Sequence, residues 1–343
     1  MDAVKAQAGR FQRFSQPENK LHIIMTLKQK KLVEYTAMLV IWLVLVLLFG
    51  TLSRNFLNAS TFVTLANRIP ALAVISTGMT LVLIIGEIDL SVGSVLGLGG
   101  AVVGLALVNF HLPFWVAALL GLGLGLLAGM LNGLVIVCLG IPSFIVTLGM
   151  LEFARGLAYL TTNSQTKYIG SSVEGLSAPI AGLAVSPAFI IAMLVIGAGQ
   201  VALSRTVFGR YLVAIGANEE AVRLSGINPV PVKMTVFALL GMLAGLGGVF
   251  YTSRLGSSDP NAGVGLELSA IAAVVIGGTS LMGGRGSVVN SFFGVLIIAT
   301  LEAGLAQIGA TEPTKRVITG MVIVGAVILD ALRQHAASRS SSE

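Results

Sequence analysis

Uninterrupted runs of apolar residues, long enough to form a helix that crosses a lipid bilayer, recur along the chain and restrict its fold more than any other feature. Residues 35–52 form such a run, and a helix of about 20 apolar residues spans about 30 Å of hydrocarbon. Irregular loops and open sheets cannot face lipid, because hydrocarbon offers their backbone polar groups no hydrogen-bond partner. The sequence therefore predicts an all-α, multispanning (polytopic) membrane protein.

Composition and charge agree with a membrane location. Hydrophobic residues make up 55% of the chain and charged residues 10%, far below the roughly 25% charged content of soluble domains. In a soluble protein, a net charge of +6 would suggest a nucleic-acid partner. Here the basic residues gather at helix ends in the positive-inside pattern, so no nucleic-acid partner is predicted. The single cysteine, Cys138, excludes an internal disulfide, and the scattered histidines predict no metal site.

Turns and polar segments divide the apolar sequence into about ten predicted spans, with both termini in the cytoplasm. Pro70 interrupts the second span, which predicts a kinked or broken helix and leaves open whether residues 61–86 form one helix or two. The predicted spans are 35–52, 61–86, 93–108, 114–139, 144–162, 187–203, 234–253, 266–282, 287–308 and 316–332.

The distribution of Lys and Arg supports this topology. A basic cytoplasmic tail, 1–34, precedes a transmembrane domain, 35–333, which contains a cytoplasmic polar segment at 204–233. A cytoplasmic C-terminal tail, 334–343, follows it. Besides the basic residues of the N-terminal tail, the predicted cytoplasmic set is Arg205, Arg210, Arg223, Lys233, Arg285, Arg333 and Arg339. The predicted external set is smaller: Arg54, Lys167, Arg254, Lys315 and Arg316.

The fourth predicted span carries a glycine at every fourth position. Gly121, Gly125, Gly129 and Gly133 lie on one helix face, which lacks side chains along its length. Such a face lets another helix approach closely, as small-xxx-small motifs do in membranes. We therefore predict a helix-packing ridge at these four residues.

Two carboxylates lie between the second and third spans, in the segment 86–93. Glu87, Asp89 and Ser91 are candidates for a gate or a substrate contact, because charged groups within membranes are costly and usually functional. Alternatively, Asp89 caps the third span through its side-chain oxygen. A second glycine-rich break at 277–287 suggests an internal duplication that would pair Gly86 with Gly277.

The chain contains no nucleotide-binding motif. The break at 277–287 lacks the Gly-Lys-Ser/Thr ending of a phosphate-binding loop, because Gly284 is followed by Arg285 and Gly286. Serine, histidine and carboxylate residues do not cluster in the sequence, so no catalytic residue is predicted and the protein is not expected to be an enzyme. If ATP drives it, another chain binds the ATP.

The predicted external loop at 254–267 offers Asp259, Asn261 and Glu267. Their oxygens and amide group suit a polyhydroxylated ligand or a docking protein. A plain solvated turn is the alternative interpretation of each residue.

The polar segment 204–233 contains a predicted short helix. Asn218 is a suitable N-cap, Glu219 and Glu220 suit the positive first turn, and Arg223 followed by Gly226 suits the end. A helix of about two turns needs a tertiary partner to be stable. With its apolar Ala221 side, this helix is suited to filling a groove on a soluble protein.

Several motifs in this region and elsewhere resemble one family. The residues Glu220 and Ala221, followed by Gly226, resemble the EAA loop of importer permeases that are driven by ATP-binding cassette proteins. Further motifs resemble those of the ribose-type branch of monosaccharide permeases, and the resemblance extends over roughly residues 50–330. These motifs are 88–93, 209–211, 214–216, Asn218, 223–227, 270–280 and 283–284.

The resemblance implies a membrane core of two permeases in the bacterial cytoplasmic (inner) membrane. It also implies a cytoplasmic ATPase that binds ATP and Mg²⁺, and a periplasmic or surface binding protein that delivers a monosaccharide. By this analogy, the coupling helix that docks on the ATPase comprises Asn218, Glu219, Glu220, Ala221, Arg223 and Gly226. The family usually has glycine where this chain has Glu87, which leaves the role of that residue open.

The main alternative is a secondary transporter driven by protons or sodium ions. In that case Glu87, Asp89, Glu152 and Glu302 would be the coupling carboxylates. Within the importer interpretation, branched-chain amino acids or nucleosides are alternative cargoes, and the sequence does not identify the sugar.

Overall fold

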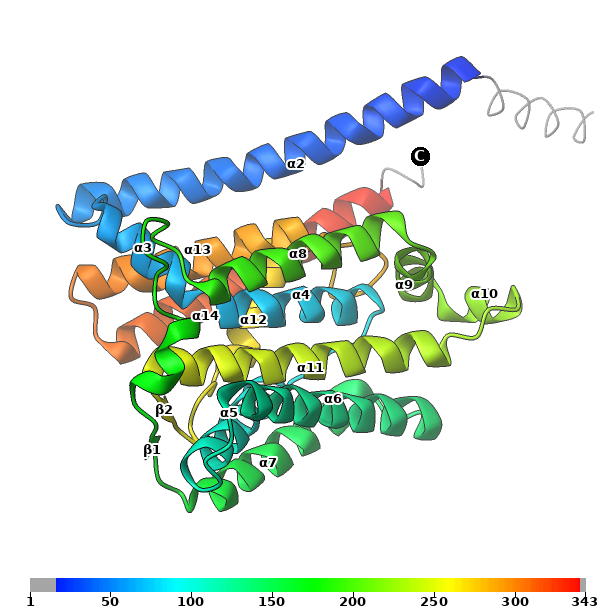
Figure 1. Ribbon diagram of the computed structural model, residues 1–343. Helices are drawn as coiled ribbons and strands as arrows, with labels where there is room; N and C mark the ends of the chain where they lie inside the picture. Colours follow the sequence, from blue (N-terminus) through cyan, green and yellow to red (C-terminus); the bar gives the residue numbers. More distant parts are fainter. Residues whose placement is uncertain (1–16, 340–343) are drawn as a thin grey trace, which may run out of the picture.

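The computed structural model describes residues 17–339 and consists almost entirely of helices (Figure 1). The outer parts of the two predicted tails, residues 1–16 and 340–343, lie outside the described residues. The α-helices are α2 (Pro17–Leu52), α3 (Ala59–Arg68), α4 (Pro70–Ile84), α5 (Val92–Val108), α6 (Phe114–Leu139), α7 (Ser143–Thr162), α8 (Pro187–Arg205), α9 (Val207–Ala217), α10 (Glu219–Leu224), α11 (Val230–Leu255), α12 (Leu266–Ile276), α13 (Val288–Gln307) and α14 (Glu312–Arg339).

Six helices in the described part of the chain are long and apolar enough to cross a membrane, and α3 with α4 makes a seventh if the bent pair is one span. The six are the Val33–Leu52 part of α2 together with α6, α7, α8, α11 and α13. The prediction of an all-α, multispanning membrane protein is therefore confirmed. The backbone of α2 is already helical from Pro17, within the predicted tail.

The structure confirms the predicted break in one span and corrects the boundary of another. Residues 61–86 form two helices, bent by 50°, because Pro70 has no N–H to continue the ladder and occupies the first turn of α4 instead. The predicted span 266–282 is too long, since α12 ends at Ile276 and the glycine-rich residues after it form a turn.

Beyond its helices, the described part of the chain has one small β-ladder and one short 3₁₀ helix. Strand β1 (Lys167–Tyr168) pairs antiparallel with β2 (Ser257–Ser258), and the 3₁₀ helix η1 spans Ser171–Leu176. These elements lie at the end of the bundle opposite to α10 (Figure 1). We refer to the two ends of the bundle as the α10 end and the β1–β2 end.

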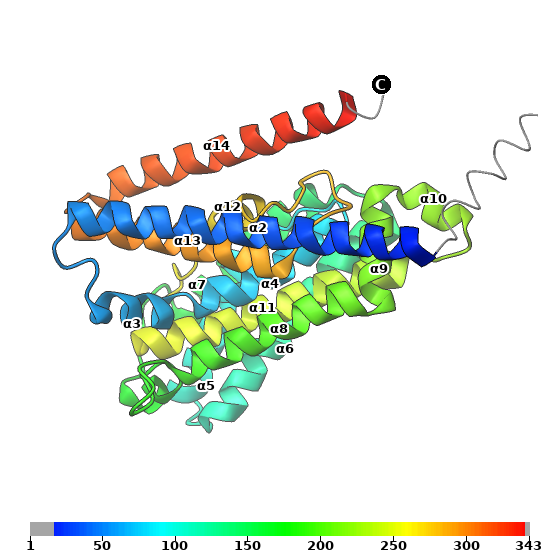
Figure 2. The ribbon, with the colours of Figure 1, turned by 90° about the horizontal axis from the view of Figure 1, so that it is seen from above.

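The centre of the bundle is α4, in which almost every residue is buried. It packs against α11, α8, α12 and α13. By contrast, α2 lies on the outside of the bundle in both views (Figures 1 and 2). It is held to α13 by a hydrogen bond from the Trp42 indole to Thr300, 3.0 Å long, and by contact of Phe49 with Gly304.

Helices α6 and α11 make the most extensive contact in the molecule, and the glycine ridge of α6 lies in it. A Cβ atom placed on Gly125 would overlap the Gly241 carbonyl oxygen, and one placed on Gly129 would overlap that of Phe237. At the two ends of the ridge, Cβ atoms on Gly121 and Gly133 would meet Val103 at 3.1 Å and Met234 at 3.2 Å. The backbones of α6 and α11 thus touch directly over their central turns.

Two non-helical segments run inside the bundle. Residues 85–91 connect α4 with α5, and residues 256–265 connect α11 with α12. The first turns of α5 and α12 lie against each other, because a Cβ atom on Gly93 would overlap Glu267 and the carbonyl oxygen of Gly263. Helix α4 leads toward the α10 end and α11 leads away from it (Figure 1). We call residues 85–91 the first interruption and residues 256–265 the second interruption. The two interruptions therefore run in opposite directions along the bundle.

The predicted duplication, which would pair Gly86 with Gly277, stays a prediction. In the structure, Gly277 follows α12 and lies against Asn290 of α13, whereas Gly86 follows α4 and lies beside Gly283.

The close contact of α6 with α11 predicts that Gly125→Ala destabilises the protein. The added methyl group has to displace the α11 backbone, and overpacking of this kind costs about 1–3 kcal/mol. The measurement is the thermal unfolding of the purified protein in detergent.

Gly123→Ala is the matched control, since a Cβ atom there meets nothing within 4 Å. It should leave the unfolding temperature unchanged or raise it slightly, because alanine favours helix over glycine by about 1 kcal/mol. Equal unfolding temperatures for the two variants would contradict the packing assigned to Gly125.

Candidate functional site

The α10 end of the bundle presents a short capped helix, as predicted. The Asn218 side-chain oxygen accepts a hydrogen bond from the Ala221 N–H, 2.9 Å away, and Glu219 and Glu220 occupy the first turn. Gly226 follows the helix with φ of +84°, a conformation that glycine adopts without strain. Figure 1 shows α10 projecting from the end of the bundle.

One side of α10 is anchored and the other is free. Val222 is buried, whereas Leu224 is 80% exposed. The remaining predicted coupling residues are exposed too, apart from the half-buried Glu219; they are Asn218, Glu220, Ala221, Arg223 and Gly226. An exposed leucine among charged groups makes this helix a suitable protein-docking surface.

Helix α9, which precedes α10, touches both glycine-rich turns at this end. A Cβ atom on Gly216 would overlap the Ile84 carbonyl oxygen and approach the Gly284 nitrogen to 2.5 Å. The Gly284 N–H donates a hydrogen bond to the same Ile84 oxygen, at 2.9 Å. A Cβ atom on Gly283 would lie 3.0 Å from the Gly86 nitrogen. Any displacement of α9 and α10 therefore acts directly on the segments at 84–86 and 283–284.

Glu87 forms an ion pair at this end. Its Oε1 lies 2.6 Å from the Lys233 Nζ, at the start of α11, and the same ammonium lies 2.9 Å from Oε2 of Glu219 in α10. The side chains of Lys233 and Glu87 are only 12% and 16% exposed. Glu87 is thus a partner in a largely buried ion pair that joins three elements, and not only a charge at a helix end.

Asp89 and Ser91 lie together in the interior of the bundle. Asp89 is 2% exposed, and its Oδ1 accepts hydrogen bonds from the Ser91 N–H at 2.7 Å and the Ser91 hydroxyl at 2.6 Å. Asn132 of α6 donates to Asp89 Oδ2 at 3.3 Å and to the Ser91 hydroxyl at 3.1 Å. Asp89 therefore fixes the non-helical segment that leads to α5.

Two of the three candidates of the second interruption, Asp259 and Glu267, also hold backbone. Asp259 accepts a hydrogen bond from the Asn261 N–H at 2.9 Å, and Glu267 accepts one from the Gly265 N–H at 3.1 Å. Arg155 of α7 donates to the carbonyl oxygens of Pro260 and Ala262, at 2.6 and 2.8 Å. The structure does not bring the six substrate-path candidates into one site.

A cavity of about 700 Å³ opens between α4, α11, α12, α13 and α14, toward the β1–β2 end. Of the six candidates, only Asn261 lines it. Its charged lining residues are Arg68, Arg254, Glu302, Glu312, Lys315 and Arg316. Sequence reasoning missed this group; the signal was the position of Arg68 and Glu302 within apolar spans, where a charge is usually functional.

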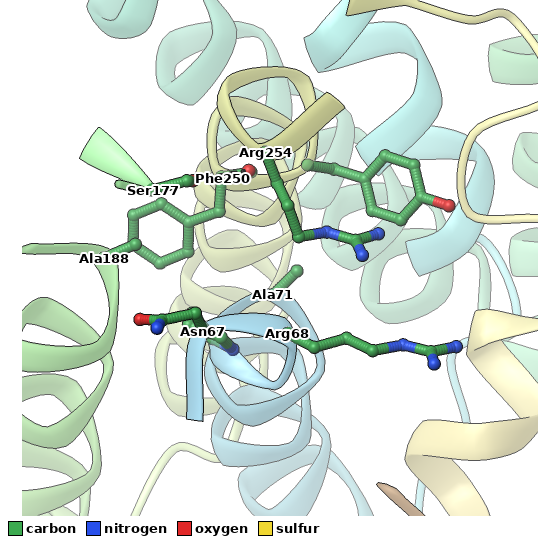
Figure 3. A pocket seen from close by; sticks show the side chains of 9 residues that line it. Asn67, Arg68, Ala71, Ser177, Ala188, Phe250 and Arg254 are labelled. Carbon is green, nitrogen blue, oxygen red and sulfur yellow. Dashed lines mark hydrogen bonds between the residues drawn. The ribbon is translucent and has the colours of Figure 1, made fainter. Parts of the chain in front are cut away.

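The cavity lining combines ion pairs with an aromatic ring. Arg68 and Glu302 are 3.3 Å apart, and the Arg254 guanidinium lies over the Tyr251 ring, 4.9 Å from its centre. Figure 3 shows a smaller neighbouring pocket, from which the Arg68 and Arg254 side chains extend in the same direction. These groups donate and accept hydrogen bonds next to a flat apolar surface.

Among the described residues, no group of three or more His, Cys, Asp and Glu side chains is placed to hold a metal ion. Glu302 lies at the β1–β2 end beside Arg68, whereas Glu87 lies at the α10 end beside Lys233. Two of the four carboxylates that a secondary transporter would use, Glu87 and Glu302, thus lie at opposite ends of the bundle.

Comparison with known proteins places the sequence among import permeases. Residues 61–327 match the family described as the permease component of branched-chain amino acid transport systems. The ribose import permease of Escherichia coli is 37% identical over 303 residues, which cover 86% of this chain and 93% of that protein.

Two further relatives match over similar lengths. The ribose import permease of Bacillus subtilis is 39% identical, with 84% of this chain and 89% of that protein covered. The autoinducer 2 import permease of Yersinia pseudotuberculosis is 34% identical, with 90% and 87% covered. No solved structure matches the chain.

The hydrogen bonds of Asp89 predict different effects for two substitutions. Asp89→Ala leaves the buried Ser91 N–H and hydroxyl without their acceptor, and an unsatisfied buried group costs about 1–3 kcal/mol. Asp89→Asn retains the oxygen that accepts both bonds and should be much less destabilising. Thermal unfolding in detergent measures both effects.

Asp259→Ala is the control, because that carboxylate holds a local turn and is only half-buried. Its effect should stay within about 0.5 kcal/mol. If Asp89→Ala were as stable as this control, Asp89 would not hold the segment that leads to α5.

Proposed function

This chain belongs to the family of permease components of branched-chain amino acid transport systems, and on that basis we propose which cargo it carries, how it crosses the membrane and where its partners bind. It is the permease subunit of an importer driven by a separate ATP-binding cassette ATPase, and it has no ATPase site of its own. An extracytoplasmic substrate-binding protein supplies the cargo. The permease imports a sugar, and the cargo that we propose is a monosaccharide of the ribose type.

The observation that carries this proposal is the similarity to two ribose import permeases over 84–86% of the chain. The family description names branched-chain amino acids, but these relatives are ribose permeases at 37% and 39% identity. The separation of Glu87 from Glu302 weighs against a secondary transporter, in which coupling carboxylates would line a common path.

For the topology, we propose ten crossings with both termini in the cytoplasm of a bacterial cell, in its inner membrane. The start of α2, the end of α14 and α10 lie at the same end of the bundle in both views (Figures 1 and 2). The short helices α5 and α12 each complete a crossing with the non-helical segment before them. The predicted cytoplasmic residues Arg205, Arg223 and Lys233 belong to the α10 end, in agreement with the positive-inside rule.

We assign α10 to docking on the ATPase, which binds ATP and Mg²⁺. The helix has an exposed face around Leu224, an anchored face at Val222, and direct backbone contact through α9 with the two glycine-rich turns. Movement of a partner that holds α10 would therefore reach the interior of the bundle without an intervening flexible loop.

The cavity at the β1–β2 end is the proposed entry for the sugar. Its volume of about 700 Å³ exceeds that of one monosaccharide. Arginine and carboxylate groups hydrogen-bond vicinal hydroxyls, and an aromatic ring packs against the apolar face of a sugar. In the assembled importer, which we expect to contain a second permease copy surrounded by lipid, this cavity would face the extracytoplasmic binding protein.

Reconstituted into proteoliposomes with its ATPase and binding protein, the permease should take up a pentose such as ribose only when ATP is supplied. An ionophore should leave the uptake unchanged. Glu220→Lys and Gly226→Leu should each lower uptake at least tenfold, because they alter the charge and the end of the docking helix, whereas the protein remains inserted.

Glu34→Lys, a charge reversal on an exposed part of α2, is the control and should transport normally. Uptake that the ionophore abolishes while ATP is present would refute the importer. Normal uptake by both α10 variants would refute the docking role of α10 alone.

Arg254→Met should lower sugar uptake severalfold in the same system, because it removes the planar donors that lie over Tyr251 in the cavity. Arg54→Met is the matched control, since Arg54 does not line the cavity. Binding of the sugar-loaded binding protein should be equal for both variants. Unchanged uptake by Arg254→Met would show that the sugar does not contact this part of the cavity.

A further inference from the structure

A single ammonium group connects the docking helix with the first interruption. Lys233 Nζ lies 2.9 Å from Glu219 of α10 and 2.6 Å from Glu87 of the segment 85–91. Lys233 itself belongs to the first turn of α11, which packs along α4, α5 and α6. One cation thus joins three parts of the chain that are distant in sequence.

The surroundings make this connection stronger than an ordinary surface ion pair. Lys233 and Glu87 are 12% and 16% exposed, so water screens their attraction only weakly. Glu219 also pairs with Arg223, 3.3 Å away, but Arg223 is 61% exposed and is spaced four residues along the same short helix. Exposed pairs of that kind contribute little. Of the two ion pairs of Glu219, the one with Lys233 is therefore the pair that resists displacement of α10 relative to the bundle.

The segment that Glu87 belongs to is held rigidly on its other side. The N–H groups of Ile88 and Leu90 donate to the hydroxyls of Ser143 and Thr147 in α7, both at 3.1 Å. Asp89 is bound to Ser91, at the N-terminus of α5. A force applied at Glu87 is therefore transmitted to the start of α5.

The start of α5 in turn touches the start of α12. Gly93 lies against Glu267 and Gly263 inside the bundle, so a shift of the α5 N-terminus alters this contact. A continuous series of contacts runs from α10 through Lys233 and Glu87 to the place where the two interrupted helices meet.

We propose that Glu87 is a positioning residue for transport: through Lys233 and Glu219 it ties α10 to the segment 85–91, so that movement of the docking helix moves the N-terminus of α5. This inference rests on the proposed docking of α10 on the ATPase. In this chain the ion pair adds a second connection to the backbone contact at Gly216.

The test is the amount of sugar transported per ATP hydrolysed by the complete importer in proteoliposomes. Glu87→Gln keeps the shape of the side chain and removes its charge, and we expect transport per ATP to fall roughly five- to tenfold, the range of a modest coupling between sites. ATP hydrolysis itself should change less than twofold, because docking and the nucleotide site remain intact. A residue needed only for folding would lower both quantities together.

A double-mutant cycle separates the link from independent effects. Lys233→Met should lower transport per ATP at least as much as Glu87→Gln, and the double variant should be no worse than Lys233→Met alone. Arg205→Gln, which removes a positive charge from the end of α8, is the matched control and should be unchanged. Glu87→Asp, which keeps the charge, is the control for a folding defect. When equal amounts of assembled complex are compared, it should transport more sugar per ATP than Glu87→Gln.

Two outcomes would overturn the inference. In the first, Glu87→Gln transports an amount of sugar per ATP that is within twofold of the amount for the unaltered importer. In the second, transport per ATP in the double variant falls by the product of the two single losses, as it would for independent sites. Failure of the unaltered importer to take up sugar would instead contradict the proposed function, so the two failures are distinguishable.

Discussion

The residues between α4 and α5 leave the helical hydrogen-bond ladder in a largely buried part of the bundle, where side chains accept hydrogen bonds from their N–H groups. Such backbone is tolerated at membrane depth only when protein groups satisfy it. Ser143 and Thr147 accept the hydrogen bonds of one interruption, and Arg155 donates to the carbonyl groups of the other. All three side chains come from α7, which is otherwise exposed along most of its length. One peripheral helix therefore braces both interruptions.

The two interruptions determine where the helices that follow them begin. Each interruption shortens the helix after it, so α5 and α12 begin inside the bundle and their first turns meet at Gly93 and Gly263. The close approach of backbone at these points, and of α6 to α11 at Gly125, leaves no room for side chains. Glycine is used here for the absence of a Cβ atom, which lets the backbones of neighbouring helices come into direct contact.

Sequence reasoning found the parts of this structure that local chemistry determines. The broken helix at Pro70, the glycine ridge of α6 and the cap formed by Asn218 each depend on neighbours a few residues away. It did not find the partners of Glu87 or of Arg155, because ion pairs and buried hydrogen bonds join residues that are far apart in the chain.

The position of the charges along α10 shows how one short helix can serve a partner and the bundle together. Its outward residues, such as Leu224, remain free for a soluble protein, and its inward residue Glu219 is bound to Lys233. If position 87 were glycine, Lys233 would retain Glu219 but lose its better-buried partner, and backbone contact at Gly216 alone would resist separation of α9 from the segment 84–86. Backbone contact resists compression and offers little resistance to pulling, whereas an ion pair resists both. Glu87 thus supplies what the glycine contacts lack, a connection that also transmits an outward movement of the docking helix.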